Sequence, residues 1–265
     1  MKKRHIIALS AIIACFMIFT GCLHVDLGSG DAVPLTTPEP SQAAEAEPDS
    51  QGYDLEILDY QADIAISTKN VWKVKESITV LFNKELHGIF QDIPVKGSFN
   101  RLVGSKNTEY KYDIRISNVK VENHPFTAGP TQDGTEMSIT IGDMDKLVRG
   151  VQEYTITYTA DMGDDGIKDF DEVYTNLLGV TWGFPIRQAE FTILMPKPFN
   201  MKDILFTCGK VGEMTDSGVA YRVDGNTINA HTTRTLEPFE CVALHIELPE
   251  GYFKGESVRE RKAKQ

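Results

Sequence analysis

The sequence lacks the local signatures of common catalytic and metal sites. It contains no G-x-S-x-G nucleophile motif, no H-E-x-x-H zinc motif and no D-x-[DN]-x-[DN]-G calcium loop. Its histidines are scattered without the spacing of zinc ligands, and no cysteine lies near a histidine that would suit catalysis. The absence of these motifs therefore excludes the familiar serine hydrolases, zinc peptidases and EF-hand proteins, and no cofactor is expected.

Basic residues are also few. The chain has 27 Lys and Arg against 38 Asp and Glu, a formal net charge of -11. This balance argues against nucleic acid as a partner and against electrostatic adhesion to anionic lipid. A long helical period with good caps is missing too, so a helical bundle is not expected.

The N-terminus contains the features of a lipoprotein signal. Lys2, Lys3 and Arg4 precede an apolar stretch, 6–19, that is too short for a comfortable membrane span, and FTGC (19–22) then resembles a lipobox. We expect residues 1–21 to be a signal peptide and Cys22 to be lipidated, which places the protein on the extracytoplasmic side of a cell membrane. Cleavage leaves 24 basic against 38 acidic residues, so the formal charge becomes -14.

The rest of the chain divides by composition. Residues 22–53 are rich in Pro, Ser, Ala, Glu and Thr and predict a disordered linker, whereas 255–265 form a charged tail. Between them, residues 54–254 show short apolar runs of period two, separated by Gly, Pro, Asp or Asn. The period predicts an all-β domain, an antiparallel β-sandwich that is immunoglobulin-like or related.

Eight strand regions are predicted, with a slip in phase near residues 116–119 that indicates a bulge. Short helical turns are open alternatives at 144–148 and 171–178. The predicted strand regions are 71–82, 114–121, 137–141, 154–158, 191–195, 204–208, 219–223 and 241–248.

Four stretches in order resemble one known family. They are HGIFQDIP (87–94), IGDMD (141–145), YTITY (154–158) and DFDEVY (169–174), followed by Gly179 and Trp182. The set is similar to domain-of-unknown-function family 2207, the N-terminal extracytoplasmic part of predicted bacterial membrane proteins, over roughly residues 55–253. The resemblance implies no catalytic residue. This chain departs from the family at Gln91, where an Arg is common, and near Thr175, where an aromatic is common.

Two groups of acidic residues invite a functional interpretation. Asp143 and Asp145 follow a predicted strand and are expected to cap a turn or belong to a recognition loop. The second group crowds one Gly-containing loop, where carboxylates at this density either bind calcium or form a solvated acidic loop. Its members are Asp161, Asp164, Asp165, Asp169, Asp171 and Glu172.

The remaining candidates are aromatic, histidine and cysteine side chains. Trp182, with Phe184, Tyr174 and Phe170 nearby, either stacks on a sugar ring or fills the core. His87 heads the first family-like stretch, which also contains Asp92, and both belong to the same predicted recognition surface. Cys208 and Cys241 are the cysteines left for a disulfide, whose formation depends on whether they face each other.

Two functions follow from these observations. The favoured one is a non-enzymatic module, anchored to the membrane by lipid, that binds an envelope protein or glycan. The alternative is a cell-envelope hydrolase or transferase that uses His87, Asp92 and the acidic loop as acid-base groups.

Overall fold

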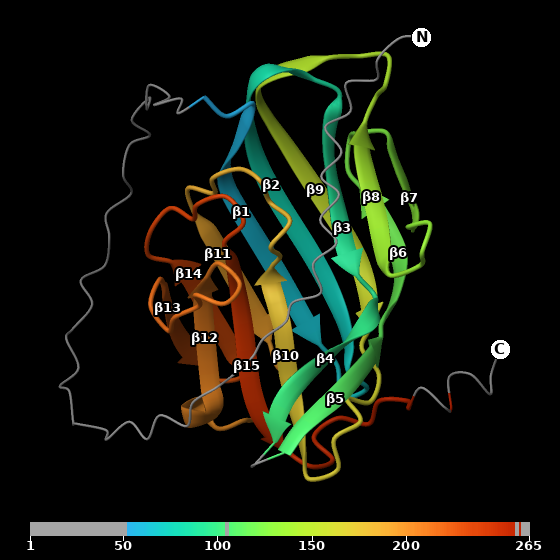
Figure 1. Ribbon diagram of the computed structural model, residues 1–265, viewed down its shortest axis with the longest axis vertical. Coiled ribbons are helices and arrows are strands. Elements are labelled where there is room, and N and C mark those ends of the chain that lie inside the picture. The colour runs from blue at the N-terminus through green and yellow to red at the C-terminus, as the bar shows by residue number, and fades with distance from the viewer. Residues whose placement is uncertain (1–51, 104–105, 258–259, 261–265) are drawn as a thin grey trace.

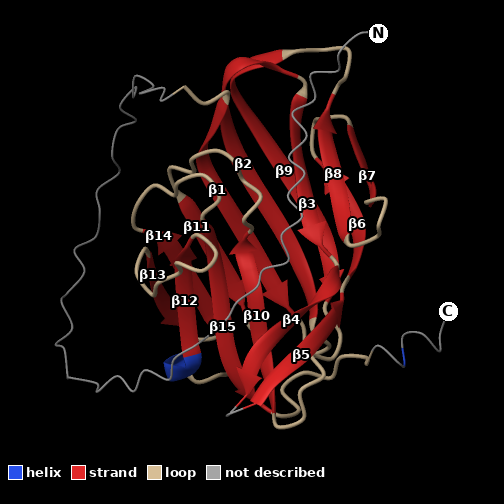
Figure 2. Ribbon diagram, viewed as in Figure 1, coloured by secondary structure: helices blue, strands red, loops and turns tan. Residues whose placement is uncertain are grey.

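The computed structural model describes residues 52–103, 106–257 and 260, and these residues form an almost entirely β structure (Figure 2). The signal peptide, Cys22 and nearly all of the linker lie outside the described residues. The strands are β1 (Leu55–Ile66), β2 (Val71–Leu86), β3 (Gly88–Pro94), β4 (Lys96–Val103), β5 (Lys106–Asp113), β6 (Arg115–Val121), β7 (Phe126–Pro130), β8 (Glu136–Gly142), β9 (Val148–Asp161), β10 (Phe170–Leu178), β11 (Ala189–Leu194), β12 (Ile204–Gly209), β13 (Val219–Asp224), β14 (Thr227–Thr232) and β15 (Cys241–Pro249), with one 3-10 turn, η1 (Met201–Asp203).

One large sheet forms the back of the molecule in Figure 1. Its strand order is β13-β14-β11-β1-β2-β9-β6, and smaller sheets β10-β15-β12 and β3-β8-β7 and the hairpin β4-β5 complete the fold. The buried side chains of the large sheet and of the smaller sheets β10-β15-β12 and β3-β8-β7 belong to one hydrophobic core. The expected all-β, sandwich-like fold is therefore confirmed.

The register of the large sheet follows from its alternating side chains. Strand β2 pairs with β1 on one side and β9 on the other, both antiparallel, so its inward residues meet inward residues of both neighbours. One pairing differs from the expected antiparallel pattern: β1 and β11 run parallel, with Tyr60 opposite Ala189 and Ile64 opposite Ile193. The predicted bulge is confirmed, because the β6–β9 register shifts between Ser117 and Lys120.

Both helical alternatives are wrong. Residues 171–178 lie in strand β10, where Asp171, Glu172 and Val173 are all buried, so burial on both faces hides the period of two. Residues 144–147 form a turn and irregular backbone that lead into β9 at Val148.

Candidate functional site

A cavity of about 540 Å³ lies on the inner face of the large sheet. Strands β1, β2 and β9 form its floor, and β3, β10 and the segment 179–182 contribute to its walls. Its volume falls within the range of about 300–1,000 Å³ that is typical of small-molecule sites. Nine carboxylate side chains and two lysines line it, so the cavity is strongly acidic: Glu76, Asp92, Asp113, Asp133, Glu136, Asp164, Asp165, Glu172 and Glu256, with Lys96 and Lys111.

Glu76 is the buried polar centre of this cavity. It occupies an inward position of β2, opposite Ala62 of β1 and Ile156 of β9, and only 3% of its surface is exposed. The hydroxyl of Tyr158 donates a 2.8 Å hydrogen bond to Glu76 Oε1. Oε2 is buried and has no hydrogen-bond partner among the described residues. A buried acceptor without a donor carries an uncompensated desolvation cost, so this oxygen is a point where a ligand could bind.

The environment of Glu76 disfavours its charge. Burial raises the pKa of its carboxyl above 4.5, although the hydrogen bond from Tyr158 and the nearby polar groups of Gln91 and Tyr60 act in the opposite direction. The same burial, and then the nearby Glu76 charge, raises the pKa of Tyr60 and of Tyr158 well above 10. Both phenols are therefore neutral donors at physiological pH.

Strand β3 adds two further acceptors. Gln91 interacts with Glu76, yet its own Oε1 is buried without a partner among the described residues, and the same holds for Oδ1 of Asp92. Burial, followed by the charges of Asp92 and Asp133, raises the pKa of Glu136 on the paired strand β8. The cavity thus presents three unpartnered oxygens, all of them acceptors unless a carboxyl is protonated.

Aromatic side chains form the apolar part of the wall. Trp182 packs edge-to-face on Tyr60, with ring centroids 6.4 Å apart, and is 8% exposed. Trp72 Nε1 donates to Asn70 Oδ1 at 2.8 Å, and Asn70 Nδ2 donates to the carbonyl of Gly163 at 2.8 Å. These bonds hold the Trp72 ring against the cavity. Both tryptophans of the chain consequently line it.

The other members of the predicted aromatic group divide between cavity and core. Tyr174 lines the cavity and packs edge-to-face on His245. Phe184 is partly buried and packs against the hydrophobic core, as the core interpretation expected. Phe170 begins β10 opposite Pro249 and does not line the cavity.

Most carboxylates of the acidic loop form hydrogen bonds or ion pairs with other residues of the protein. Asp164 accepts the N–H of Gly166, and Asp171 accepts the N–H of Phe253 at 2.7 Å. Glu172 lies 3.2 Å from His245 Nε2, whereas Asp169 is exposed. Among residues 52–103, 106–257 and 260, no group of three or more His, Cys, Asp or Glu is placed to hold a metal ion. The geometry gives the calcium hypothesis no support.

Asp165 is a loop residue whose carboxyl has a raised pKa. It accepts the N–H groups of Ile167 at 2.9 Å and Glu172 at 3.0 Å. Burial first, and then the charges of Asp171 and Glu172, raises its pKa to about 6 despite these two bonds.

The structure separates His87 from the acidic residues of the cavity. His87 Nδ1 contacts the carbonyl oxygens of Lys146 at 2.9 Å and Asp143 at 3.2 Å. Four residues of strand β3 lie between His87 and Asp92, and five steps along an extended chain correspond to about 16 Å between their backbones. They cannot act as the acid-base pair of the enzyme hypothesis. Asp143 Oδ1 accepts the N–H of Asp145 at 3.0 Å, the turn-capping bond expected from the sequence.

Cys208 and Cys241 are free, buried thiols in this structure, so the disulfide that the sequence left open is not formed here. Cys208 lies opposite Val242 and Cys241 opposite Gly209. Because paired residues share a face and successive residues alternate, the two thiols point to opposite faces of the β10-β15-β12 sheet. The Cys208 thiol contacts Arg234, whereas Cys241 contacts the carbonyl of Gly209.

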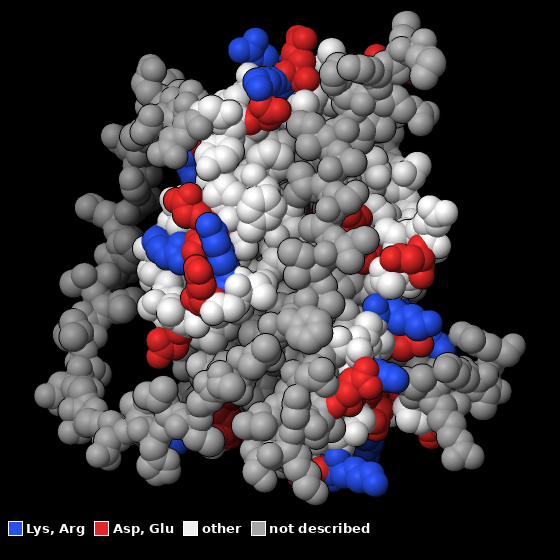
Figure 3. All heavy atoms as spheres, viewed as in Figure 1, with Lys and Arg blue, Asp and Glu red and all other residues white. Residues whose placement is uncertain are grey.

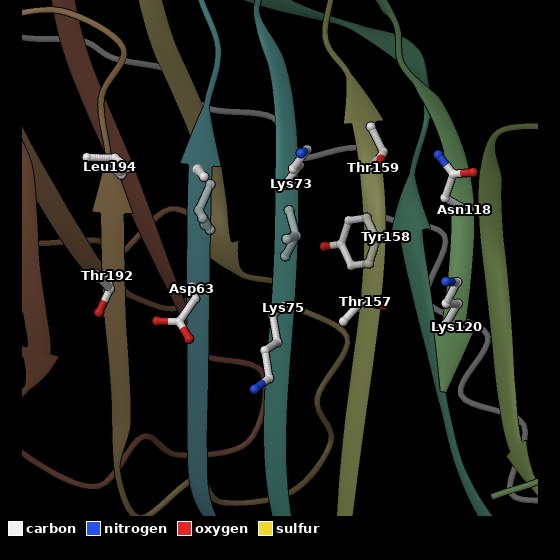
Figure 4. A pocket seen from close by; sticks show the side chains of 13 residues that line it. Asp63, Lys73, Lys75, Asn118, Lys120, Thr157, Tyr158, Thr159, Thr192 and Leu194 are labelled. Atoms are coloured by element: carbon white, nitrogen blue, oxygen red, sulfur yellow. The ribbon is translucent and has the colours of Figure 1, made fainter. Parts of the chain in front are cut away.

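A second hollow of about 540 Å³ lies on the outer face of the large sheet. Figure 4 shows Lys73 and Lys75 on β2, Asp63 on β1 and Lys120 on β6. Its labelled side chains are mostly exposed, and the buried unpartnered oxygens lie in the inner cavity instead. On the face drawn in Figure 3, basic and acidic side chains lie in small mixed groups. The inner cavity is therefore the better candidate site.

Sequence reasoning missed Glu76, Tyr60 and Tyr158, although one signal was present. The inward positions of β2 read Trp72, Val74, Glu76, Ile78, Val80 and Phe82, so a carboxylate interrupts an otherwise apolar series. A charged residue in phase with core residues is rarely buried without a specific role.

The family model described as the N-terminal domain of a predicted membrane protein (DUF2207) matches residues 56–251. No curated protein matches. No helix among the described residues has the length and apolar character needed to cross a membrane.

Similar solved structures include an M1 zinc metallopeptidase from Deinococcus radiodurans, with 9% identity, a TM-score of 0.37, and coverage of 72% of this chain and 42% of that one. Native yeast LTA4 hydrolase has 9% identity and a TM-score of 0.40, with coverage of 73% and 29%. A putative protease from Parabacteroides distasonis has 8% identity and a TM-score of 0.39, with coverage of 73% and 40%. The chain spans less than half the length of each, and these TM-scores carry no inference about its activity.

Proposed function

The chain belongs to this family of predicted membrane proteins, and on that premise we propose that it is a lipid-anchored, extracytoplasmic module that binds a glycan component of the cell envelope. In this proposal Cys22 carries the anchor, the Pro-rich linker spans the headgroups, and the inner cavity holds the ligand without chemical change.

The N-terminal sequence supports the anchor. Two or more acyl chains are needed for stable attachment, because each buried methylene contributes only about 0.8 kcal/mol. A Cys22→Ser variant should therefore move from the membrane fraction to the soluble fraction and lose incorporation of labelled palmitate. An unchanged distribution and unchanged labelling would contradict the anchor.

The cavity supports glycan binding through one observation above all. It combines buried oxygens without partners, at Glu76, Gln91 and Asp92, with the aromatic rings of Tyr60 and Trp182. Sugar rings offer hydroxyl donors for such acceptors and C–H faces that pack on aromatic rings. A cavity that served only as core would be filled by apolar side chains.

The test uses the intrinsic fluorescence of the two tryptophans. The full-length protein in detergent micelles is titrated with soluble disaccharide fragments of wall glycan, and a saturable change in emission is expected because both indole rings line the cavity. Trp72→Phe and Trp182→Phe variants assign the change to one ring. If no wall fragment alters the emission, and calorimetry also shows no heat of binding, glycan binding is rejected.

The enzyme alternative is less well supported. It required His87 to lie near Asp92, but His87 instead contacts the backbone of the 143–146 turn. A general base must come within hydrogen-bonding distance, or within one water, of its partner. Binding without catalysis remains the simpler use of the cavity.

A further inference from the structure

The cavity also indicates which chemical group its ligand carries. This inference rests on the proposed function and narrows it from glycans in general to one class of sugar. It starts from two neighbouring side chains, Glu76 on β2 and Gln91 on β3, which interact with each other. Each retains a buried oxygen without a partner, Oε2 of Glu76 and Oε1 of Gln91.

The two oxygens need a donor rather than an acceptor. The other oxygen of Glu76 already accepts a hydrogen bond from Tyr158, so the carboxylate is held in place while Oε2 remains available. A primary ammonium group has three N–H donors and no acceptor, which matches this pair of oxygens. A neutral hydroxyl would satisfy one oxygen but leave the charge of Glu76 without a counter-ion.

The charge of the whole cavity favours a cation. Nine carboxylates and two lysines line it, and a concave site with one dominant sign of charge concentrates ligands of the opposite sign. The aromatic wall adds the same preference, because the faces of Tyr and Trp rings attract cations. An anionic or strictly neutral ligand would use neither feature.

We propose that the cavity binds the free primary amine of an amino sugar, with its ammonium group held between Glu76 Oε2 and Gln91 Oε1 and its ring against Tyr60 and Trp182. The sugar ring then occupies the aromatic part of the cavity, and the ammonium group replaces the missing donor. N-acetylation removes the charge, so the site discriminates de-N-acetylated from N-acetylated sugars.

The experiment compares three small probes on the full-length protein in detergent micelles. Glucosamine, N-acetylglucosamine and glucose are titrated separately while tryptophan fluorescence is recorded. We expect glucosamine to bind at least about tenfold more tightly than the other two, or by about 1.4 kcal/mol, since a charge-assisted hydrogen bond is stronger than a neutral one. Equal affinities for all three would overturn the amine proposal but leave glycan binding intact.

Variants locate the interaction. Glu76→Gln keeps the shape of the side chain and removes its charge, and it should lower the affinity for glucosamine to that for glucose. Gln91→Arg places a guanidinium beside Glu76 and should weaken glucosamine binding by at least about tenfold, because it supplies an internal counter-ion. Asp169→Asn removes an exposed carboxylate of the adjoining loop that does not line the cavity and serves as the matched control, with an expected change of less than about twofold.

The outcomes separate the two proposals. If wall disaccharides bind but glucosamine does not, the amine proposal fails and the glycan proposal stands. If neither binds, both fail. If Glu76→Gln unfolds, as a thermal melt would show, Gln91→Arg alone decides: undiminished glucosamine affinity in that variant overturns the site.

Discussion

The raised pKa of Asp165 predicts a measurable pH dependence of stability. The pKa of its carboxyl rises from 3.8 to about 6, chiefly because folding buries the side chain. A group whose folded pKa is raised contributes stability that is fully present below about pH 3.8 and is lost as the pH rises through about 6. The full shift corresponds to about 3 kcal/mol. Because the side chain is only half-buried, screening by solvent reduces the expected effect to roughly 1–1.5 kcal/mol.

The perturbation is Asp165→Asn, which removes the titration and retains one of the two oxygens that accept the N–H groups of Ile167 and Glu172. Between about pH 4 and about pH 7 the unmodified protein should lose roughly 1–1.5 kcal/mol more of its unfolding free energy than the variant. Urea unfolding at several pH values, followed by tryptophan fluorescence, measures this difference in slope. The slope is the relevant quantity, because loss of a backbone hydrogen bond shifts the variant equally at every pH.

The neighbouring variant Asp164→Asn provides the control. Asp164 also accepts a backbone N–H, from Gly166, but its side chain is exposed. Its substitution should leave the pH slope close to that of the unmodified protein. Equal slopes for the unmodified protein and Asp165→Asn would refute the reasoning, since burial would then have no effect on that carboxyl.

Two further predictions concern stability alone. Glu56 is buried and accepts two hydrogen bonds from Arg187, at 2.8 and 3.0 Å. The Arg187→Met variant should therefore lower the free energy of unfolding by about 3–5 kcal/mol, because it leaves a buried carboxylate without its counter-ion. Adding Glu56→Gln should recover part of this loss in urea unfolding, and a double variant no more stable than the single one would contradict the pairing. Gly142 has a φ of +135°, and a Cβ atom there would collide with backbone atoms. The Gly142→Ala variant should therefore lower the free energy of unfolding by about 3 kcal/mol or more. The control Gly129→Ala, where a Cβ atom meets open space, should change it little.

The sequence predicted several strands whose two faces differ in burial. In β2, β8, β9 and β12 the buried and exposed positions alternate over much of the strand, so the period of two is visible without a structure. In β10 the alternation fails, because three successive residues are buried. In β7 it fails for the opposite reason, because most of its side chains are exposed. Alternation alone does not decide the outcome, because β1 alternates as clearly and was not predicted, whereas β15 was predicted although its first four residues are all buried.

The site was less predictable than the fold. Glu76 was visible as an interruption in an apolar series, but its partners Tyr60, Tyr158 and Gln91 come from three other strands. Which residues meet depends on strand order and register, which single-sequence patterns do not contain. The two buried cysteines illustrate the same limit: one step of register between β12 and β15 decides whether their thiols share a face.

The parallel pairing of β1 with β11 has a consequence for how the sheet is assembled. In the large sheet, β2, β9, β6 and β1 join through antiparallel pairs, as do β11, β14 and β13, and the two groups meet only at this seam. The paired residues Tyr60 and Ala189 are far apart in the chain, so a large loop must close before the seam forms. Until the C-terminal group is synthesised, β1 remains an edge strand with unpaired backbone groups. A chain synthesised from its N-terminus thus completes its central sheet late. It is prone to aggregation through the exposed edge of β1 until β11 pairs with that edge.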